Sequence, residues 1–195
     1  MWKSKRLLPL IFGIGLLSVF VLMAAWPQLF TQYGQKEMFM PWLKPDEVHL
    51  LGTNALGYDI FTELVYGARQ TLFVGVMSSI ATMLLGTVIG TLSTFRGVIG
   101  WLFNGLINIF VLLPKLITLI VLASFVGSST TNLIILIAAF SWVGIARNIR
   151  AKVIHLNALP FVENCIIQGY SRPHIVVYHI IPNLYDVLLS RFLLG

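Results

Sequence analysis

The chain has 195 residues, of which 57% are hydrophobic and 10% are charged, and its mean hydropathy is +0.88. A water-soluble domain of this size does not need so much apolar surface, so the composition excludes the ordinary soluble classes. The formal net charge is +6, but no basic patch lies among aromatic residues in a soluble region, which excludes a nucleic-acid partner. The expected surrounding is a lipid bilayer.

Four long apolar stretches predict complete membrane-spanning helices, because about 20 apolar residues cross a bilayer core of roughly 30 Å. These stretches are residues 7–25, 70–95, 101–125 and 131–147. The turn-forming residues from Gly127 to Thr130 separate the last two. A fifth span begins near residues 175–182 and is unfinished at Gly195. The sequence thus predicts an all-α, polytopic transmembrane bundle with four complete spans and a partial fifth.

Basic residues set the expected orientation, because the cytoplasmic ends of spans carry an excess of Lys and Arg. One basic cluster lies at the N-terminus and consists of Lys3, Lys5 and Arg6. Four crossings return the chain to the same side, where the second basic cluster consists of Arg147, Arg150, Lys152 and Arg172. The segment between the first two spans holds five of the seven acidic residues, namely Glu37, Asp46, Glu47, Asp59 and Glu63. We therefore expect a cytoplasmic N-terminus and an acidic segment outside.

This orientation divides the chain into three parts. Residues 1–26 form an N-terminal transmembrane helix, with a cleaved signal peptide as the alternative. Residues 27–68 form an extracytoplasmic segment with an interfacial helix. Residues 69–195 form the membrane domain, which includes a cytoplasmic loop at about residues 150–180.

The cytoplasmic loop has the pattern of a short amphipathic helix from about Pro160 to Gln168. Proline suits the first helical turn, and Gly169 suits the left-handed position that ends a helix. Four apolar residues share one side of this helix, namely Phe161, Val162, Cys165 and Ile166. Such a side lies in the headgroup layer or inserts into a groove on a partner protein. Cys165 is the single cysteine, so we expect a reduced, structural thiol.

Two motifs carry a resemblance to a known family. The first combines Glu163, Gly169 and the run His-Ile-Ile-Pro-Asn at His179–Asn183, and it resembles the EAA loop of ATP-binding cassette (ABC) importer permeases in the dipeptide, oligopeptide and nickel group. The second consists of His49–Asp59 followed by Tyr66–Arg69, and it resembles two segments of the C-type subunit in that group.

The resemblance covers about residues 47–195 and implies a type I ABC importer permease in a bacterial inner membrane. It implies that the loop helix is a coupling helix that docks on a cytoplasmic ATPase. The implied coupling residues are Phe161, Glu163, Cys165, Ile166, Gly169, His179 and Pro182. The implied partners are a second homologous permease subunit, two cytoplasmic ATP-binding subunits and an extracytoplasmic substrate-binding protein, and the implied substrates are peptides or nickel.

The chain departs from the family pattern at a few positions. Asn164 and Cys165 replace the Ala-Ala that follows the glutamate, Tyr58 replaces an arginine and Asn54 replaces an aspartate. The family's core continues through a complete fifth span and a sixth, so the chain is expected to be truncated at its C-terminus. The alternative function is a degenerate or truncated membrane protein that acts as a relic or scaffold without transporting.

Polar residues inside the third predicted span indicate a translocation path. Asn104, Asn108, Lys115 and Thr118 fall within roughly 80° of one another on an ideal helix. A lysine at mid-membrane costs roughly 2.5–3.5 kcal/mol on insertion scales, so it is expected to face the bundle or water. Lys115 then attracts a substrate carboxylate, or it pairs with Asp186, or it lies near an interface.

Gly86 and Gly90 have the spacing of a close helix contact in the second span. The sequence contains no phosphate-binding loop and no catalytic triad or metalloprotease motif. Its histidines, His49, His155, His174 and His179, lack a cysteine or carboxylate cluster at ligand spacing, so no metal site is expected. We expect the chain to be no enzyme and to bind no cofactor, with ATP hydrolysed by the partner subunits.

Overall fold

A computed structural model of the chain describes residues 2–127 and 129–194. Within these residues the regular structure is helical, and two isolated β-bridges are the β-type pairings. The chain divides into two compact units, Met1–Gly75 and Val76–Gly195. The all-α prediction is confirmed.

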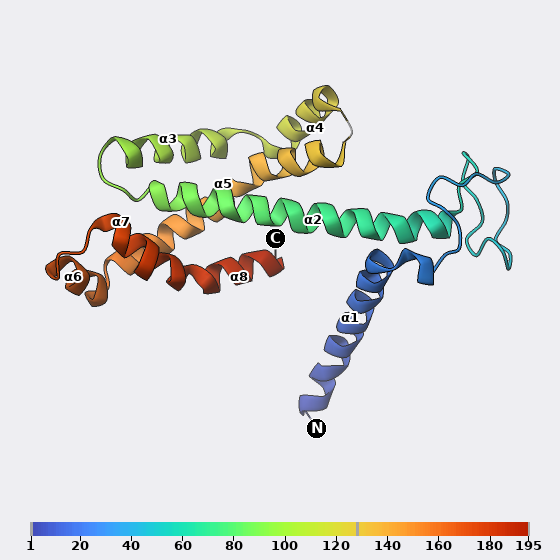
Figure 1. Cartoon of the computed structure of the whole chain (residues 1–195), viewed down its shortest axis with the longest axis horizontal. Helices are drawn as coiled ribbons and strands as arrows, with labels where there is room; N and C mark the ends of the chain where they lie inside the picture. Colours follow the sequence, from blue (N-terminus) through green and yellow to red (C-terminus); the bar gives the residue numbers. More distant parts are fainter. Residues whose placement is uncertain (1, 128, 195) are drawn as a thin grey trace. The chain divides into compact units, whose positions relative to one another are not determined.

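The first unit begins with helix α1 (Trp2–Ala25) and the short 3₁₀ helix η1 (Pro27–Leu29), as Figure 1 shows. Residues 30–59 form an irregular loop, after which helix α2 (Ile60–Leu92) begins. Within residues 27–68, where an interfacial helix is expected, the helical elements are η1 and the first turns of α2.

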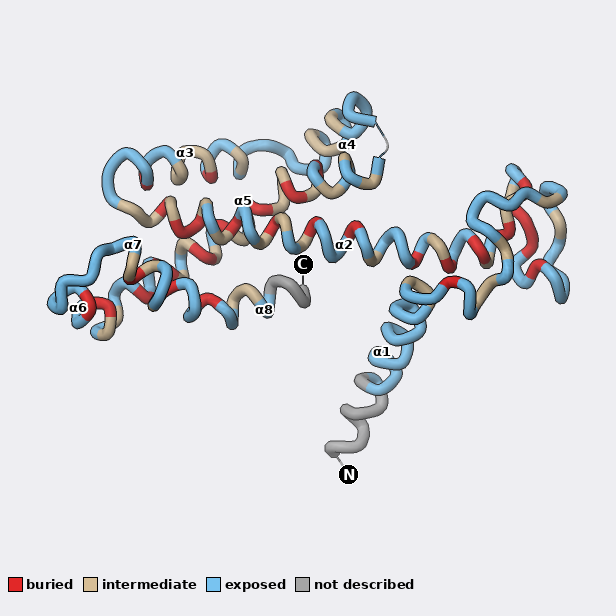
Figure 2. The backbone as a smooth tube through the Cα atoms, in the orientation of Figure 1, coloured by how far each residue is buried: buried red, intermediate tan, exposed pale blue. Residues whose placement is uncertain are grey.

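The second unit is built around helix α5 (Thr130–Asn157), which packs against α3, α4, α6 and α8. Figure 2 shows buried positions following one another along α5. It also contains the C-terminal part of α2. The other elements are α3 (Val98–Leu112), α4 (Lys115–Val126), α6 (Pro160–Ile167), α7 (Arg172–Ile175), the π-helix η2 (Val176–Ile180), the 3₁₀ helix η3 (Ile181–Leu184) and α8 (Tyr185–Leu194).

Two clusters of buried apolar side chains hold this unit together. The first cluster joins the C-terminal half of α5 to the elements that follow it, and it consists of Ile149, Val153, Leu156, Val162, Cys165, Ile175, Ile180 and Leu184. The second cluster joins α3 to the middle of α5 through Ile107, Trp142 and Ala146. Each fully buried Ile, Leu or Val contributes about 1.5–3 kcal/mol, so the loop after α5 is fixed to that helix by its own core.

Helix α2 approaches α5 closely at two glycines. A Cβ atom on Gly86 would lie 2.7 Å from the Ile145 side chain, and a Cβ atom on Gly90 would lie 2.6 Å from the Ala146 carbonyl oxygen. No other residue fits at this separation without moving the backbones apart. The close packing that the GxxxG spacing predicts is confirmed.

The number of continuous spans differs from the prediction. Helices α2 and α5 are long and apolar enough to cross a membrane, and the apolar part of α1, Ile11–Ala25, is shorter. The third predicted span, 101–125, is not one helix, because α3 and α4 meet at an angle of 88°. By length and composition, the described residues therefore contain two helices that could cross a membrane, or three if the bent pair counts as one span, and the chain is a multi-pass membrane protein.

Proline chemistry explains the bend between α3 and α4. Leu113 has an extended conformation (φ −74°, ψ 127°), and Pro114 precedes the first residue of α4. A proline lacks the backbone N–H that would continue the helical hydrogen bonds, and it disfavours the helical conformation of the residue before it. The proline therefore ends α3 rather than kinking a single helix.

Candidate functional site

The predicted loop helix exists and has the expected start. Helix α6 runs Pro160–Ile167, with Pro160 in its first turn and Leu159 in an extended conformation before it. Proline suits this position because the first turn of a helix leaves its N–H groups unpaired. The predicted range of 160–168 is confirmed to within one residue, since Gln168 caps the helix.

The end of α6 is fixed by a glycine. Gly169 has φ +84°, a conformation that residues with a Cβ rarely adopt. Its N–H donates to the Ile166 carbonyl at 3.0 Å, and the Tyr170 N–H donates to the Cys165 carbonyl at 3.1 Å. This pair of bonds is a Schellman motif, which satisfies the last carbonyls of the helix. Gly169 therefore ends the helix in the left-handed conformation that the sequence predicts.

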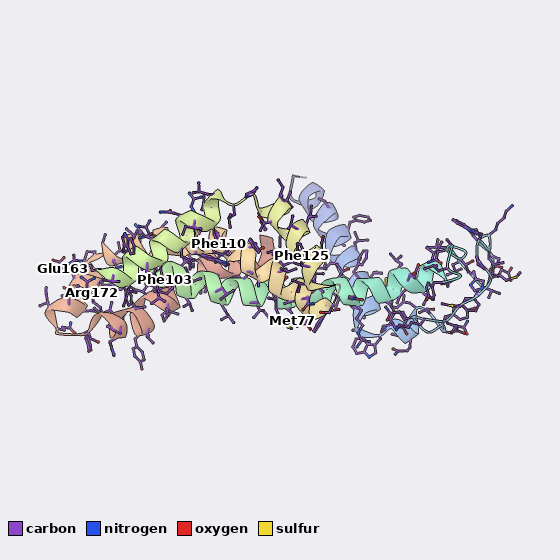
Figure 3. The ribbon with its side chains drawn as sticks, turned by 90° about the horizontal axis from the view of Figure 1, so that it is seen from above. Met77, Phe103, Phe110, Phe125, Glu163 and Arg172 are labelled. Carbon is purple, nitrogen blue, oxygen red and sulfur yellow. The ribbon has the colours of Figure 1, made fainter. Side chains whose placement is uncertain are left out.

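The orientation of α6 differs in part from the prediction. Val162 and Cys165 are 3% and 9% exposed and belong to the chain's own core, and Phe161 is half-buried beside them. Their side of the helix therefore packs largely against the chain's own core. The outer side carries Glu163, which Figure 3 labels, together with Ile166 and Ile167. Of the apolar residues predicted on the docking side, Ile166 is the exposed one.

His179 and Pro182 lie where the helix after α6 changes its geometry. His179 is half-buried in the π-helix η2, and Pro182 is exposed in the 3₁₀ helix η3. The Ile181 N–H pairs with the Val176 carbonyl five residues back, so this turn is wide. Pro182 supplies no N–H to the next turn. The helical pitch of this segment therefore changes between His179 and Pro182.

The sequence patterns did not predict a cluster of aromatic rings that includes His179. The Tyr170 and His174 rings stack with centroids 4.8 Å apart and planes at 7°, and the Tyr178 ring lies 4.5 Å from His174. The His174 and His179 rings are 6.1 Å apart. In the part of the chain that the structure describes, no three His, Cys, Asp or Glu residues group as metal ligands.

The four polar residues of the predicted membrane stripe do not lie on one helix. Asn104 and Asn108 belong to α3, whereas Lys115 and Thr118 belong to α4, beyond the bend. The Asn104 amide donates to the Ser93 carbonyl at 3.2 Å, and the Thr118 hydroxyl donates to the Pro114 carbonyl at 3.1 Å. The stripe was derived for a continuous helix, and that premise is wrong.

Lys115 nevertheless has a polar surrounding. It is the first residue of α4 and lines a cavity of about 240 Å³, whose lining includes Ser79, Thr82 and Ser141. Within the described residues the Lys115 ammonium group forms no ion pair. Asp186, the partner considered from the sequence, pairs with Lys152 instead, and Asp186 Oδ2 lies 2.8 Å from Lys152 Nζ. Hydroxyl groups and one cation thus meet at the bend.

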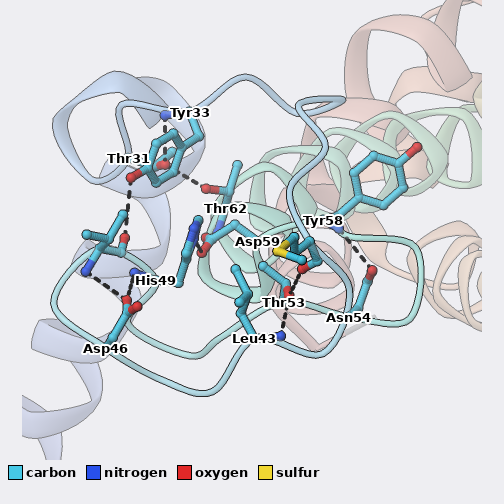
Figure 4. Close-up of polar contacts among 12 residues, drawn as sticks. Thr31, Tyr33, Leu43, Asp46, His49, Thr53, Asn54, Tyr58, Asp59 and Thr62 are labelled. Atoms are coloured by element: carbon cyan, nitrogen blue, oxygen red, sulfur yellow. Dashed lines mark hydrogen bonds and ion pairs between the residues drawn. The ribbon is translucent and has the colours of Figure 1, made fainter.

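The second motif, His49–Asp59, folds around a buried contact between its first and last residues, shown in Figure 4. His49 and Asp59 are 5% and 4% exposed, and His49 Nδ1 lies 2.9 Å from Asp59 Oδ2. Asp59 also caps α2, because its Oδ1 accepts from the Thr62 N–H at 2.7 Å. Burial raises the pKa of Asp59, but hydrogen bonds from Thr62 and His49 outweigh it and hold the pKa below its usual value. His49 and Asp59 thus link the two ends of this motif.

Asn54 holds the turn within the same motif. Its Oδ1 accepts from the Leu56 and Tyr58 N–H groups at 2.8 and 3.0 Å, and its Nδ2 donates to Glu63 at 2.8 Å. An aspartate at this position accepts the same backbone bonds but lacks the N–H donor for the glutamate. Asn54 thus preserves the turn while adding a bond to α2.

Comparisons with known proteins agree with the motifs. Residues 82–195 match the family model described as "Binding-protein-dependent transport system inner membrane component". The chain is 30% identical over 188 residues to the dipeptide transport system permease protein DppC of Alkalihalophilus pseudofirmus, an alignment that covers 95% of this chain and 62% of that protein. It is 28% identical over 186 residues to the oligopeptide transport system permease protein OppC of Haemophilus influenzae, covering 94% of this chain and 60% of that protein. The chain spans about three fifths of the length of these relatives.

Proposed function

Because the chain belongs to the family of binding-protein-dependent transport system inner membrane components, we propose that it is a permease subunit of an ATP-driven peptide importer. The names of its relatives, a dipeptide and an oligopeptide permease, support this substrate class over nickel. The proposal includes a second homologous permease subunit, two cytoplasmic ATP-binding subunits and an extracytoplasmic binding protein. ATP is hydrolysed by the partner subunits, and this chain binds no cofactor.

The observation that supports coupling most directly is the way α6 is held. Its inner side is anchored in the core of the second unit by Val162 and Cys165, while its outer side presents Glu163, Ile166 and Ile167. A short helix with one anchored side and one exposed side receives a displacement at its surface and passes it to the helices behind it. In this proposal the outer side of α6 docks on the ATPase.

The transmission would run through the first core cluster. Val162 and Cys165 share that cluster with Ile149 and Val153 of α5 and with Ile180 of η2. Close-packed side chains do not compress, so a movement of α6 shifts α5 and the helix after it together. The proposed result is that the path through the membrane opens to the other side. In this proposal Gly169 and Pro182 are the joints at which the segment after α6 turns.

We also propose that Lys115 contributes to this path. Its cavity is lined by hydroxyl groups from α2 and α5, and its charge has no acidic partner within the described residues. An unpaired cation among membrane helices favours an anionic ligand. The C-terminal carboxylate of a peptide has that chemistry. We propose three further path residues, and the basis is their position on α3 and α4, the two helices that flank the bend. They are Asn104, Asn108 and Thr118.

The test of coupling is capture of the ATPase by the full chain. Glu163→Lys is expected to lower co-purification of the ATP-binding subunit about tenfold, the effect of losing one charge-assisted contact, while the amount of chain in the membrane stays unchanged. Glu47→Lys makes the same charge change on an exposed residue of the first unit and serves as the matched control. Undiminished capture by Glu163→Lys would count against a docking role for this side of α6.

Uptake of a radiolabelled dipeptide tests transport separately. Cells that lack the gene are expected to lose uptake and to regain it when the chain is supplied. If the chain captures the ATPase but does not restore uptake, the scaffold alternative is the better description. If deletion leaves uptake unchanged, the proposed importer function is wrong.

A further inference from the structure

A second cavity lies among the elements at the α6 end of the second unit. Its volume is about 330 Å³, and it is bounded by the turn after α2, the end of α5, α6 and α7. Apolar side chains form much of its wall, among them Phe95, Ile154 and Ile175. Two arginines, Arg96 and Arg172, line it from two different elements.

The charge around this cavity is unbalanced. Neither Arg96 nor Arg172 forms an ion pair with any residue that the structure describes. Asp186 is already bound to Lys152, and Glu163 is exposed on α6. Arg96 and Arg172 are both exposed to solvent. With two guanidinium groups and no carboxylate in its lining, the cavity attracts an anion.

Unsatisfied polar atoms lie next to the cavity lining. In the described residues, Arg150 Nε and Thr91 Oγ1 are buried without a hydrogen-bond partner. Arg150 precedes the lining residue Ile154 by one helical turn, and the carbonyl of Thr91 accepts a bond from the hydroxyl of the lining residue Thr94 at 2.7 Å. Buried polar atoms normally have partners. Both atoms lie near the cavity, but neither residue is part of its lining.

Guanidinium groups select among anions by geometry. Arginine presents planar paired donors that match the oxygens of a phosphate, and two arginines from different elements can hold one phosphate from two sides. Apolar walls beside such groups suit a phosphate attached to a lipid, and basic pockets between membrane helices on the cytoplasmic side bind lipid headgroups. The lining of this cavity combines both features.

We propose that Arg96 and Arg172 bind the phosphate of an anionic group in this cavity, presented by a phospholipid headgroup or as free phosphate. The site borders the outer side of α6 at Ile166, which also lines the cavity, and it shares no lining residue with the Lys115 cavity. Because Arg96 lies on the turn after α2 and Arg172 on α7, an occupied site ties these two elements together. Its existence does not depend on the proposed transport function.

The full chain in nanodiscs provides the test. With phosphatidylglycerol in place of phosphatidylcholine, the thermal midpoint of the wild-type chain is expected to rise. The double variant Arg96→Gln/Arg172→Gln is expected to lose this rise and to bind phosphatidylglycerol at least about tenfold more weakly in native mass spectrometry. Arg147→Gln removes an exposed arginine that is not in the cavity lining and is expected to behave as the wild type.

Two further arms separate the sources and guard against misfolding. Inorganic phosphate added to phosphatidylcholine nanodiscs raises the midpoint if free phosphate is the ligand and leaves it unchanged if the lipid is. The double variant Arg96→Lys/Arg172→Lys keeps both charges and is expected to restore part of the binding, which an unfolded chain would not. Equal loss in Arg147→Gln, or no difference between the wild type and the double glutamine variant with either probe, would overturn the proposal.

Discussion

The buried His49–Asp59 pair determines how the loop before α2 tolerates substitution. Asp59 has two tasks, because one carboxylate oxygen meets His49 and the other caps α2 at Thr62. A carboxylate only accepts hydrogen bonds, so His49 Nδ1 is the donor in this pair. The loop thus depends on one side chain that links its fold to the start of a membrane helix.

Replacing Asp59 by alanine is expected to destabilise this loop by about 2–4 kcal/mol. The variant leaves the buried His49 ring without its partner and removes the helix cap, at about 1–3 and about 1 kcal/mol. Asp59→Asn retains a capping oxygen and is expected to lose about half as much. Hydrogen exchange of residues 46–62 in the solubilised chain measures both effects. Equal protection in the wild type and in Asp59→Ala would show that the pair does not hold the loop.

The same pair predicts a dependence on pH. The pKa of Asp59 in the folded chain lies below its usual value of about 3.9, so the folded state favours the ionised form. This stabilisation is fully present above pH about 4 and is lost as the pH falls through the lowered pKa. Exchange of the loop amides, corrected for its intrinsic pH dependence, is expected to accelerate below pH 4. Asp59→Asn provides the control, because its side chain does not titrate.

At the scale of the elements, Gly90 allows α2 to pack closely on α5. The Ala146 backbone would meet a Cβ atom there at 2.6 Å from oxygen and 3.0 Å from Cα, so an added methyl group forces the helices apart. Backbone atoms cannot rotate away as a flexible side chain can.

Gly90→Ala is expected to destabilise the second unit by about 1–3 kcal/mol, the usual cost of overpacking. Thermal unfolding in one detergent, followed by tryptophan fluorescence, should then show a midpoint lower by several degrees. Gly144→Ala on α5 is the matched control, because no neighbouring heavy atom outside the helix's own backbone lies within 4 Å of the Cβ position there. A midpoint that falls equally in both variants would indicate an effect of helix propensity or local flexibility rather than of packing.

Sequence patterns succeeded for elements that depend on neighbouring residues. Pro160 and Gly169 fix the two ends of α6 locally, so its range was predictable. The polar stripe failed because the angular argument requires one continuous helix, and Pro114 ends α3 instead. The sequence pattern predicted that the side of α6 with Val162 lies in the headgroup layer or in a partner's groove, whereas Val162 packs in the chain's own core. A periodic pattern reveals an apolar side but not what covers it.

At the scale of the whole molecule, contacts between distant residues explain what the sequence did not reveal. His49 and Asp59 meet only because the loop folds back before α2, and Asp186 meets Lys152 rather than Lys115 because α8 returns along α5. The family, by contrast, was recognisable from two short motifs, since these keep their residue types and spacing.

Membrane topology gives a prediction for the complete chain. In a Cys165→Ala background, which removes the single cysteine, we expect Ile167→Cys to react with a membrane-impermeant thiol reagent only after the cells are opened. Met40→Cys is expected to react in intact spheroplasts. The two positions are matched, with 77% and 73% exposure. Labelling of Ile167→Cys in intact spheroplasts would contradict the cytoplasmic orientation that the basic residues indicate.

The 88° bend between α3 and α4 has a consequence for the lipid around the chain. A helix end leaves up to four backbone groups unpaired, and here the last carbonyls of α3 and the first N–H groups of α4 come together around Leu113 and Pro114. Acyl chains offer these groups no hydrogen bonds, and each unpaired group in hydrocarbon costs several kcal/mol. If the bend lies at membrane depth, water or another polypeptide must therefore cover it, and the annular lipid shell around this chain will be interrupted there.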